Sequence, residues 1–305
     1  MVDVGSEYEP AKNRYDHHQR GFSVTFPNHT TKLSSAGLVY MHFGRTLISQ
    51  QTSLPVDHPN VTIVYEKLYK DFIEAIDAND NGISAYDSAA LDAANVEARF
   101  KQFQITLPSM VSDLNHPDPT ADPDEPQDED NLFAKASKLM GTAFVRKLSI
   151  ACSSWLPALD TVKGAYKSRH DVHQSGRIII LPQSGIPWKE HLYNIEKEES
   201  GDSGDDSTDL VYYVLYPEGL TEGSKWRVQC VSTSEGSFES RKPLPSPWRG
   251  VRDEHLDGVM SEEAEKTGKA KIPEGAVFVH ASGFIGGHKT KEGAMAMAVR
   301  SLEES

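Results

Sequence analysis

An aspartate followed by two histidines is the first part of this sequence that could carry out chemistry. The group is Asp16-His17-His18, and two other acidic segments accompany it, Val2-Asp3-Val4-Gly5 and Asp77-Ala78-Asn79-Asp80-Asn81-Gly82. Carboxylate oxygens are typical ligands of Mg²⁺ and Mn²⁺, and an imidazole shifts a mixed site towards Mn²⁺ or a later metal. Two such ions about 4 Å apart can hold a phosphate for in-line attack by an activated hydroxide. The three segments therefore predict a divalent-metal site that hydrolyses phosphate esters.

Each of these segments also has a simpler structural interpretation. Asp3 could cap a turn after a strand, and the two imidazoles could lie in a solvated polar loop. Asp, Asn and Gly all favour turns, so the segment from Asp77 to Gly82 could simply end a helix. Asp77 and Asp80 are rival candidates for a ligand within it. Spacing alone does not separate the structural interpretation from the chemical one.

Seven short stretches, taken together, carry a specific resemblance to a known family. They are Val2-Asp3-Val4-Gly5-Ser6-Glu7-Tyr8, Arg14-Tyr15-Asp16-His17-His18-Gln19, Lys32-Leu33-Ser34-Ser35-Ala36-Gly37-Leu38, Asp80-Asn81-Gly82-Ile83-Ser84, Pro187-Trp188-Lys189-Glu190-His191, Pro247-Trp248-Arg249-Gly250 and His280-Ala281-Ser282-Gly283-Phe284-Ile285-Gly286-Gly287-His288. They resemble the DHH phosphoesterase superfamily, and within it the eukaryotic branch of metal-dependent RNA exonucleases called the melanocyte-proliferating-gene product family. The resemblance covers nearly the whole chain.

The resemblance implies a role for each residue of the expected metal site. Asp3 occupies the place of the aspartate that bridges both metals, and His17 that of a ligand to one metal. Asp80, followed by Asn-Gly as in the family, takes the place of the aspartate in the fourth motif. His18 is expected near the scissile phosphate, where a protonated imidazole would stabilise the pentacoordinate phosphate, and Asp16 is expected to orient a histidine. The implied cofactor is Mn²⁺ or Mg²⁺ in a two-metal site.

The resemblance also implies how the chain is divided. A DHH-like α/β domain with a parallel sheet flanked by helices is expected over residues 1–155, and a smaller α/β substrate-binding domain over 156–305. Gly286-Gly287-His288-Lys289 resembles the glycine-rich loop of that second domain. In such a loop the glycines let backbone amides approach an anion, and His288 and Lys289 would reach a terminal phosphate or ribose. A tight strand-to-helix turn is the alternative.

The substrate and compartment follow from the same resemblance. The implied activity is a 3′–5′ RNA exonuclease, a phosphodiesterase that acts on single-stranded 3′ ends in the nucleus and the mitochondrion, with the cytoplasm as a further option. One family motif has no counterpart, because the branch opens with His-Asn-Gly-x-Phe-His-x-Asp-Glu whereas Met1 directly precedes the second motif. That motif supplies the first metal ligands. A second interpretation therefore stays open, a catalytically impaired protein of the same fold that binds RNA or a protein partner.

The size and composition suit a two-domain protein without a membrane anchor. The 305 residues are enough for two buried cores, and no apolar run approaches the ~20 residues of a membrane span. No basic segment followed by an apolar one opens the chain as a signal peptide would. Cys152 and Cys230 lack metal-type spacing, which favours buried thiols in a reducing compartment.

The formal net charge of −14 argues against a large nucleic-acid-binding face. The charge is, however, unevenly distributed. Residues 113–130 and 196–209 hold fifteen of the 45 acidic residues and one of the 31 basic residues, so the rest of the chain is near neutral. Their composition predicts a solvated loop and a surface insertion. Any attraction for nucleic acid is expected to be modest and local.

The hydrophobic pattern predicts the elements that must position these residues. Apolar residues at helical spacing predict helices from Ser34-Ser35 to about 47, over about 61–77, 84–105 and 131–152, and after Gly286-Gly287. β-Branched and aromatic residues predict strands over 177–181, 210–216, 226–232 and 276–280, and residues 1–4 resemble the end of a buried parallel strand. Trp155-Leu156-Pro157 marks the expected hinge between the domains.

Overall fold

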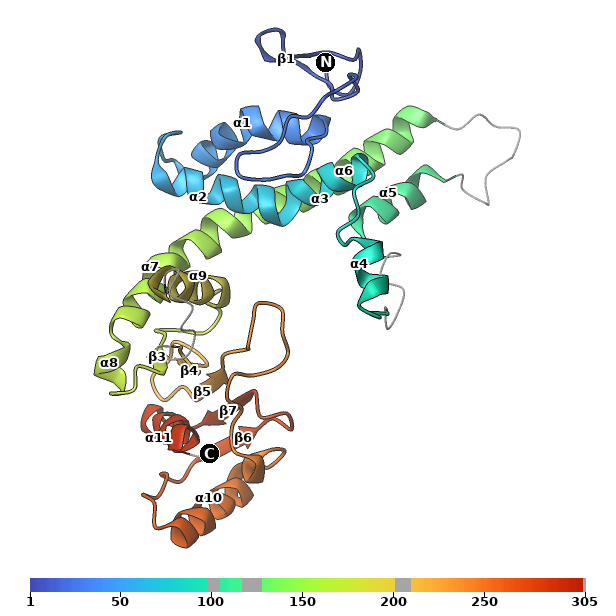
Figure 1. Ribbon diagram of the computed structural model, residues 1–305. Helices are drawn as coiled ribbons and strands as arrows, with labels where there is room; N and C mark the ends of the chain where they lie inside the picture. The colour runs from blue at the N-terminus through green and yellow to red at the C-terminus, as the bar shows by residue number, and fades with distance from the viewer. Residues whose placement is uncertain (98–104, 117–127, 201–209, 304–305) are drawn as a thin grey trace. The chain divides into compact units, whose positions relative to one another are not determined.

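The structure is a computed structural model that describes residues 1–97, 105–116, 128–200 and 210–303. The chain forms two compact units, Met1–Leu156 and Pro157–Ser305. The first unit is mainly helical, and the second combines a mixed sheet with helices (Figure 1). The expected α/β class is confirmed at that level. No helix in the described ranges is both long and apolar enough to cross a membrane.

The first unit has two helical runs that follow a long loop. Helix α1 spans Ser35–Thr52. The second run joins α2 (Pro59–Leu68), the π-helical segment η2 (Tyr69–Ile73) and α3 (Glu74–Asp80) end to end. Both helices expected here are confirmed, and the second continues three residues further than expected, as far as Asp80. Because of this extension, Asp77 and Asp80 lie on the last turns of a helix rather than in a turn.

The remaining helices of this unit agree less closely with expectation. The helix expected over 84–105 is wrong in its described part, where only α4 (Ser88–Ala93) is helical, and 98–104 lie outside the described residues. Helix α5 spans Leu107–Asn115. The solvated loop expected over 113–130 lies mostly outside the described residues, as does the insertion at 201–209.

A continuous helical run joins the two units along the chain. Helix α6 (Glu129–Ile150) passes through the π-helical segment η3 (Ala151–Trp155) into α7 (Leu156–Lys167). The helix expected over 131–152 is therefore confirmed. The two units divide between Leu156 and Pro157, at the place where the hinge was expected, and these residues are helical. Pro157 lies inside this run, directly after η3, where the wider π-helical turn with its hydrogen bond from Leu156 N to Ala151 O already interrupts the regular i→i−4 pattern.

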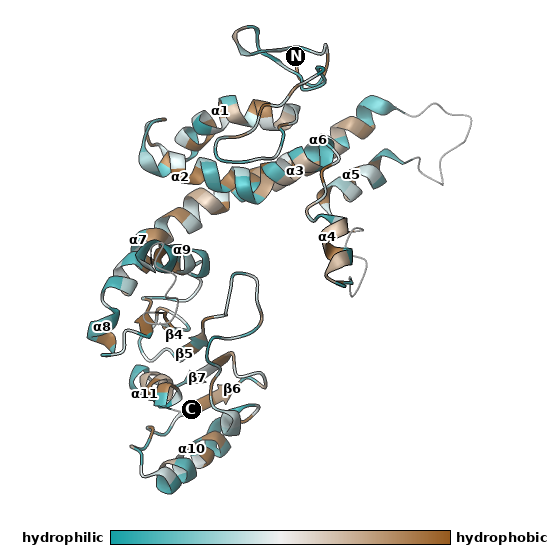
Figure 2. Cartoon of the chain, in the orientation of Figure 1, coloured by the Kyte–Doolittle hydropathy of each residue, from teal (hydrophilic) through white to brown (hydrophobic). Residues whose placement is uncertain are grey.

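Stacked aromatic rings fix the loop that precedes α1. The Phe26 ring lies parallel to that of Tyr69, with 3.7 Å between the ring centroids, and it also contacts Tyr65 and Tyr40. All four side chains are buried, and Leu33 beside them is completely buried. In Figure 2, helices α1 and α2 carry brown, hydrophobic residues next to teal, hydrophilic ones, as expected of helices with one side in a core. Ring stacking adds to the free energy gained by burying these large side chains, so the loop from Asp16 to Leu33 is held against α1 and α2.

The N-terminal segment differs from the expected buried parallel strand. Val2 and Val4 are 51% and 57% exposed, and Val2 makes one isolated parallel bridge, to Tyr15. Asp3 has a φ of 61°, which interrupts the extended conformation that a strand requires. The only sheet in the described part of this unit pairs β1 (Tyr8–Glu9) with β2 (Arg14–Tyr15) in antiparallel fashion. The parallel sheet expected for the first domain is thus not found in these residues.

The second unit contains a five-stranded sheet in the order β3-β4-β5-β7-β6. Its strands are β3 (Ile178–Ile180), β4 (Tyr213–Pro217), β5 (Trp226–Cys230), β6 (Ala276–Val279) and β7 (Ile285–His288). The β3–β4 pair is parallel and the other three pairs are antiparallel. The four strands predicted from the sequence are confirmed, and β7 is an additional strand that the sequence analysis missed.

Side chains alternate between two separate cores on the two faces of this sheet. Leu215 and Val228 pack with α10 (Asp253–Thr267) and α11 (Lys291–Glu303). Ile179 and Val214 pack on the opposite face with α7 and α9 (Lys189–Ser200). The helix expected after Gly286-Gly287 is α11, which begins four residues after Gly287. Cys152 and Cys230 are both buried free thiols.

Candidate metal centre

Three segments of the first unit bring acidic and imidazole side chains together. One donor atom each from Asp3, Asp16, His17 and His18 lies within 4.8 Å of the other three. Asp80, from the end of α3, joins them because its Oδ2 lies 3.3 Å from Nε2 of His17. The five residues assigned to the site from the sequence therefore lie side by side, although up to 77 positions separate them along the chain.

Asp16 is an anchoring carboxylate buried beneath the two histidines. Its Oδ2 accepts a hydrogen bond from Ser6 N at 2.7 Å, and its Oδ1 accepts from His18 N at 3.1 Å and from His18 Nδ1 at 2.7 Å. Burial alone would raise the pKa of this carboxyl, but the hydrogen bonds from His18 and Ser6 outweigh it and lower the pKa to about 2. Asp16 thus stays ionised and fixes the orientation of His18.

The His18 side chain is 58% exposed and rests against the buried ring of His17. The two ring centroids are 4.1 Å apart. The hydrogen bond to Asp16 is the main cause that raises the pKa of His18, and the charges of Asp16, Asp3 and Asp80 act in the same direction. Because Nδ1 is directed at Asp16, Nε2 is the ring nitrogen that His18 presents to a ligand.

His17 lies between two carboxylates and the start of α1. Its Nδ1 is 3.2 Å from Ser35 N, 3.1 Å from Ser35 Oγ and 3.5 Å from Oδ1 of Asp3. The Ser35 hydroxyl in turn donates to Asp3 Oδ1 at 2.9 Å. From the sequence, Ser34 and Ser35 were expected at the start of a helix. Ser34 is indeed the N-cap of α1, but Ser35 connects His17 with Asp3, a contact that spacing alone does not reveal.

Asp77 and Asp80, the two candidate ligands of α3, differ in burial and in the groups that they contact. Asp77 is completely buried, and its Oδ1 accepts hydrogen bonds from Ser34 and Gly37 at the start of α1. Asp80 lies three residues later, almost one turn of the helix, and faces His17 with a half-exposed carboxylate. Asp80 is therefore the acid of α3 that lies beside His17, and its role as a metal ligand stays a prediction.

The donor set fits a divalent cation. Asp3 and Asp80 offer carboxylate oxygens and His17 offers an imidazole nitrogen, a combination that suits Mn²⁺ and also admits Mg²⁺. Two ligands about 2.1 Å from one ion at a right angle are about 3 Å apart. The 3.3 Å between His17 Nε2 and Asp80 Oδ2 is close to that spacing. This pair would hold one ion after only a small adjustment.

Comparison with known proteins places the chain in a family. Residues 1–302 match the family model MYG1_exonuc, described as "Uncharacterised protein family (UPF0160)". The chain belongs to the MYG1 exonuclease family. It is 43% identical to the MYG1 exonuclease of Rattus norvegicus over 310 residues, which cover 100% of this chain and 73% of the relative. The predicted membership of the melanocyte-proliferating-gene product family is thereby confirmed, and the placement in the DHH phosphoesterase superfamily stays a prediction.

Other members of the MYG1 exonuclease family match over the same extent. The MYG1 exonuclease of Homo sapiens is 41% identical over 314 residues, covering 100% of this chain and 74% of that protein. The MYG1 protein of Dictyostelium discoideum is 39% identical over 308 residues, covering 100% and 83%. No solved structure matches the chain.

The two glycines expected in an anion-binding loop, Gly286 and Gly287, lie in a β-strand instead. Gly286 and Gly287 lie within β7, where Gly287 pairs with Arg227 of β5 on one side and Phe278 of β6 on the other. A Cβ on Gly287 would lie 2.2 Å from Nη1 of Arg227, whose guanidinium crosses this point of the sheet. The expectation of an open anion-binding turn is wrong, because the two glycines allow close packing across three strands.

His288 and Lys289, at the end of β7, differ sharply in exposure. His288 is completely buried, its Nδ1 accepts from Thr290 N at 3.0 Å and its Nε2 lies 3.0 Å from the carbonyl oxygen of Pro273. With both ring nitrogens engaged, His288 packs and supports the start of α11. Lys289 is exposed. A role for Gly286, Gly287, His288 and Lys289 in substrate binding stays a prediction.

The packing around His288 makes Gly293 of α11 a sensitive position. A Cβ on Gly293 would lie 1.9 Å from Cε1 of His288, whose ring is buried and hydrogen-bonded on both sides. Gly293→Ala is expected to lower the free energy of unfolding by about 1–3 kcal/mol through overpacking. Gly258→Ala in α10 is the matched control, because its Cβ would meet no atom within 4 Å. That variant should instead gain roughly 0.4–1 kcal/mol. Urea unfolding measures both, and equal stabilisation would contradict the described packing.

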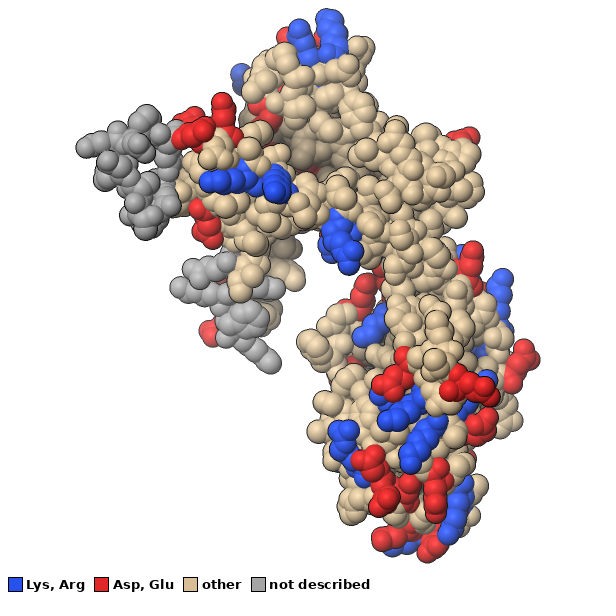
Figure 3. Space-filling view, turned by 180° about the vertical axis from the view of Figure 1, so that it is seen from behind, with Lys and Arg blue, Asp and Glu red and all other residues tan. Residues whose placement is uncertain are grey.

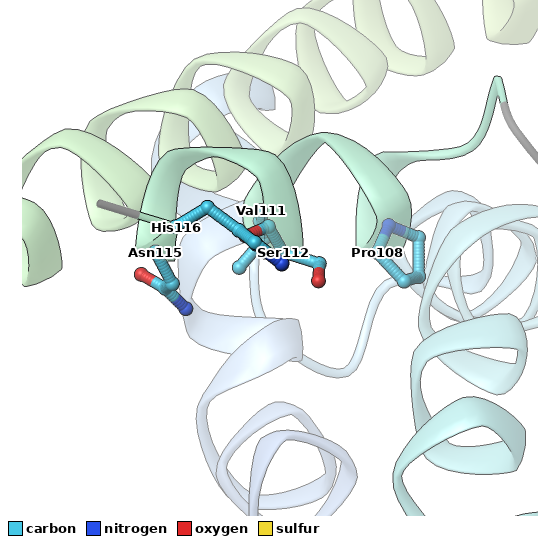
Figure 4. Close-up of a pocket in the computed structure, with 5 residues that line it drawn as sticks. All are labelled: Pro108, Val111, Ser112, Asn115 and His116. Atoms are coloured by element: carbon cyan, nitrogen blue, oxygen red, sulfur yellow. The ribbon is translucent and has the colours of Figure 1, made fainter. Parts of the chain in front are cut away.

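Within the residues that the structure describes, no second group of three or more possible metal ligands lies together. A hollow beside α5 is lined by Pro108, Val111, Ser112, Asn115 and His116 (Figure 4). This lining offers one imidazole and no carboxylate, so it is a poor donor set for Mn²⁺ or Mg²⁺. On the face of the second unit seen in Figure 3, basic and acidic side chains alternate. That face does not form one large basic area for a polyanion.

Proposed function

We propose that this member of the MYG1 exonuclease family is a divalent-metal-dependent 3′–5′ exonuclease that hydrolyses phosphodiester bonds in RNA. The observation that carries the proposal is the convergence of Asp3, His17, His18 and Asp80 in a chain whose relatives are named exonucleases. The preference for RNA and for 3′ ends follows from the resemblance of the sequence motifs to the DHH phosphoesterase superfamily. The nucleus and the mitochondrion are the proposed compartments on the same basis.

The two units would divide the work in this proposal. Residues 1–155 form the DHH-like catalytic domain, because every residue of the metal-binding cluster lies there. Residues 156–305 form the substrate-binding domain, and Lys289 is its exposed cation among the four predicted residues. Since basic and acidic side chains alternate on the face of the second unit that Figure 3 shows, substrate affinity there would come from a few local contacts and fall with rising salt.

The chain's own residues would act on the phosphate in distinct ways. Bound Mn²⁺ or Mg²⁺ supplies Lewis-acid activation of the phosphate and of the attacking water. Asp16 holds the Nδ1 side of His18, and the raised pKa of His18 favours its protonated form. A protonated His18 would direct Nε2–H towards a phosphoryl oxygen and stabilise the charge that accumulates there in the transition state. The Ser35 hydroxyl contacts both His17 and Asp3 and so fixes the position of these two side chains relative to each other.

A nuclease assay with end-labelled RNA tests this function. With Mn²⁺, a 5′-labelled single strand should give a ladder that shortens with time, because nucleotides leave the 3′ end one by one. A 3′-labelled strand should release labelled mononucleotide at once. EDTA should abolish both products. A 3′-phosphorylated strand and a DNA strand of the same sequence measure the dependence on the 3′ end and on the 2′-hydroxyl.

The outcomes of this assay separate the alternatives. Internal fragments from both labelled strands would point to an endonuclease and contradict the exonuclease proposal. RNA binding without cleavage at any Mn²⁺ or Mg²⁺ concentration would instead support the non-catalytic member of the same fold. Slow exonuclease activity would differ from both results, because it would still shorten the 5′-labelled strand from its 3′ end and release labelled mononucleotide from the 3′-labelled strand.

A further inference from the structure

Asp77 is a buried carboxylate that connects α3 to the start of α1. Its Oδ1 accepts hydrogen bonds from Ser34 N at 2.9 Å, Ser34 Oγ at 2.7 Å and Gly37 N at 3.0 Å. The amides at a helix start have no partner within the helix, so a carboxylate there satisfies them and interacts favourably with the helix dipole. This cap is supplied from 43 residues away, by a different helix.

The fit between Asp77 and the start of α1 leaves no spare space. A Cβ on Gly37 would lie 2.3 Å and 2.4 Å from the two carboxylate oxygens of Asp77. Neither group can move easily, because Asp77 is completely buried and Gly37 is part of a buried helical turn. Any side chain at position 37 would therefore push α1 and α3 apart at this point.

Ser35 lies between the two residues that Asp77 holds. Its hydroxyl oxygen lies 3.1 Å from Nδ1 of His17, where it can accept the Nδ1–H of a histidine that binds an ion through Nε2, and the same hydroxyl donates to Asp3 Oδ1 at 2.9 Å. The position of Ser35 is thus set by the cap on either side of it. The next turn of α3 carries Asp80, whose Oδ2 lies 3.3 Å from the other ring nitrogen of His17. One carboxylate on α3 therefore fixes both helix ends that face the His17 ring.

We propose that Asp77 is a positioning residue of the metal centre, which locks α1 to α3 so that Ser35 and Asp80 hold the His17 ring from opposite sides. The inference rests on the proposed metal-dependent function, since it concerns the residues that would hold the ion. Asp77 does not contact the ion in this proposal. Partners that orient a metal-ligating histidine typically change metal affinity 10- to 100-fold when they are removed.

The three hydrogen bonds of the cap all end on Oδ1 of Asp77. Burial raises the pKa of Asp77, so the interior disfavours its ionised form. The second oxygen, Oδ2, accepts no hydrogen bond of good geometry, although the Tyr69 hydroxyl is nearby. An asparagine could keep Oδ1 in place and put its amide where Oδ2 stands. Asp77→Asn is therefore the conservative variant that should retain the cap.

The test compares two variants of Asp77 with a core variant that is remote from the site. Ile48 is completely buried in α1, and the thirteen residues from Ser35 to Ile48 correspond to about 20 Å along the helix. Ile48→Ala therefore lowers stability without touching the cap. Isothermal calorimetry with MnCl₂ alone, run well below the melting temperature of each full-length variant, gives the Mn²⁺ affinity. Thermal unfolding gives the stability.

A positioning role predicts a particular pattern of affinities. Asp77→Ala should weaken Mn²⁺ binding about 10- to 100-fold, and Asp77→Asn should restore most of that loss. Ile48→Ala should bind Mn²⁺ like the unmodified chain, even though its melting temperature falls. Gly37→Ala should weaken binding as Asp77→Ala does, because it displaces the same carboxylate from the opposite side. Unchanged affinity in folded Asp77→Ala, or equal losses in Asp77→Ala and Ile48→Ala, would overturn the proposal.

A second readout works without metal and separates this inference from the proposed function. The ¹⁵N chemical shifts of the His17 ring nitrogens report the hydrogen bonds to Ser35 and Asp80 in the metal-free chain. Asp77→Ala and Gly37→Ala should shift them, whereas Asp77→Asn and Ile48→Ala should not. If the unmodified chain binds no Mn²⁺, the proposed function fails while these shifts still decide the positioning role. If the shifts are the same in all five proteins, the positioning role is refuted.

Discussion

Replacing His18 with alanine is expected to lower the turnover of RNA by about 10²- to 10⁴-fold, the usual contribution of a positioned general acid. The reason is that His18 presents Nε2 to the site while its Nδ1 is held by Asp16 at 2.7 Å. Mn²⁺ affinity should change little, because Asp3, His17 and Asp80 would still hold the ion. Single-turnover assays at saturating Mn²⁺, combined with calorimetric titration, measure the two effects separately.

The control for this prediction is His280→Ala. His280 is an exposed histidine of the second unit whose Nδ1 lies 2.9 Å from the Ser282 hydroxyl. Its loss should leave turnover and Mn²⁺ affinity unchanged. If His18→Ala weakens Mn²⁺ binding as strongly as the loss of a carboxylate ligand does, His18 is itself a ligand. The separation of roles between His17 and His18 would then be wrong.

Replacing Asp3 with alanine is expected to have the opposite signature, a loss of Mn²⁺ affinity of at least about 100-fold. The loss of a residue that merely orients a ligand already costs 10- to 100-fold, and Asp3 would be a ligand itself. Its Oδ1 lies 3.5 Å from the ring of His17 and accepts the Ser35 hydroxyl, so its removal also leaves that hydroxyl without its acceptor. Calorimetric titration with MnCl₂ measures the change.

Glu9→Ala is the matched control for Asp3→Ala. Glu9 is another carboxylate of the N-terminal segment, with a side chain that is 43% exposed, and it pairs with Lys12 at 3.0 Å. Its removal should leave Mn²⁺ binding unchanged, because isolated surface ion pairs contribute little. Equal Mn²⁺ affinities for Asp3→Ala and Glu9→Ala would show that Asp3 is not a ligand, and that the remaining side chains complete the site without it.

Several elements could be predicted because their side chains repeat with a clear period. The apolar residues of α1 recur at helical spacing after a Ser-Ser start, and four strands of the second unit are rich in β-branched and aromatic residues. Strand β7 escaped prediction because Gly286 and Gly287 have no side chains to show an alternating pattern. The guanidinium of Arg227 occupies the position that a side chain of residue 287 would take, and Arg227 lies 60 positions earlier, so no local pattern reveals this contact.

The sequence predicted which residues form the candidate site, but it did not predict the contacts that hold these residues in place. The acidic and histidine segments could be recognised from residue type and family pattern, and the structure brings Asp3, Asp16, His17, His18 and Asp80 together. The role of Ser35 and the cap by Asp77 depend on contacts between residues 18 to 43 positions apart, which no local pattern encodes. The exposure of Val2 and Val4 was missed for a related reason, because an apolar pair predicts a buried strand only where partner strands exist.

The most direct test of the metal centre is X-ray anomalous scattering from crystals of this chain grown with Mn²⁺. Data collected on both sides of the manganese absorption edge locate the ion independently of any assumption about its ligands. The proposed site predicts an anomalous peak about 2.1 Å from both His17 Nε2 and Asp80 Oδ2, with Asp3 as a further ligand. Peaks confined to other residues, with His17 still directed at Ser35 and Asp80 as in the metal-free chain, would contradict the assignment.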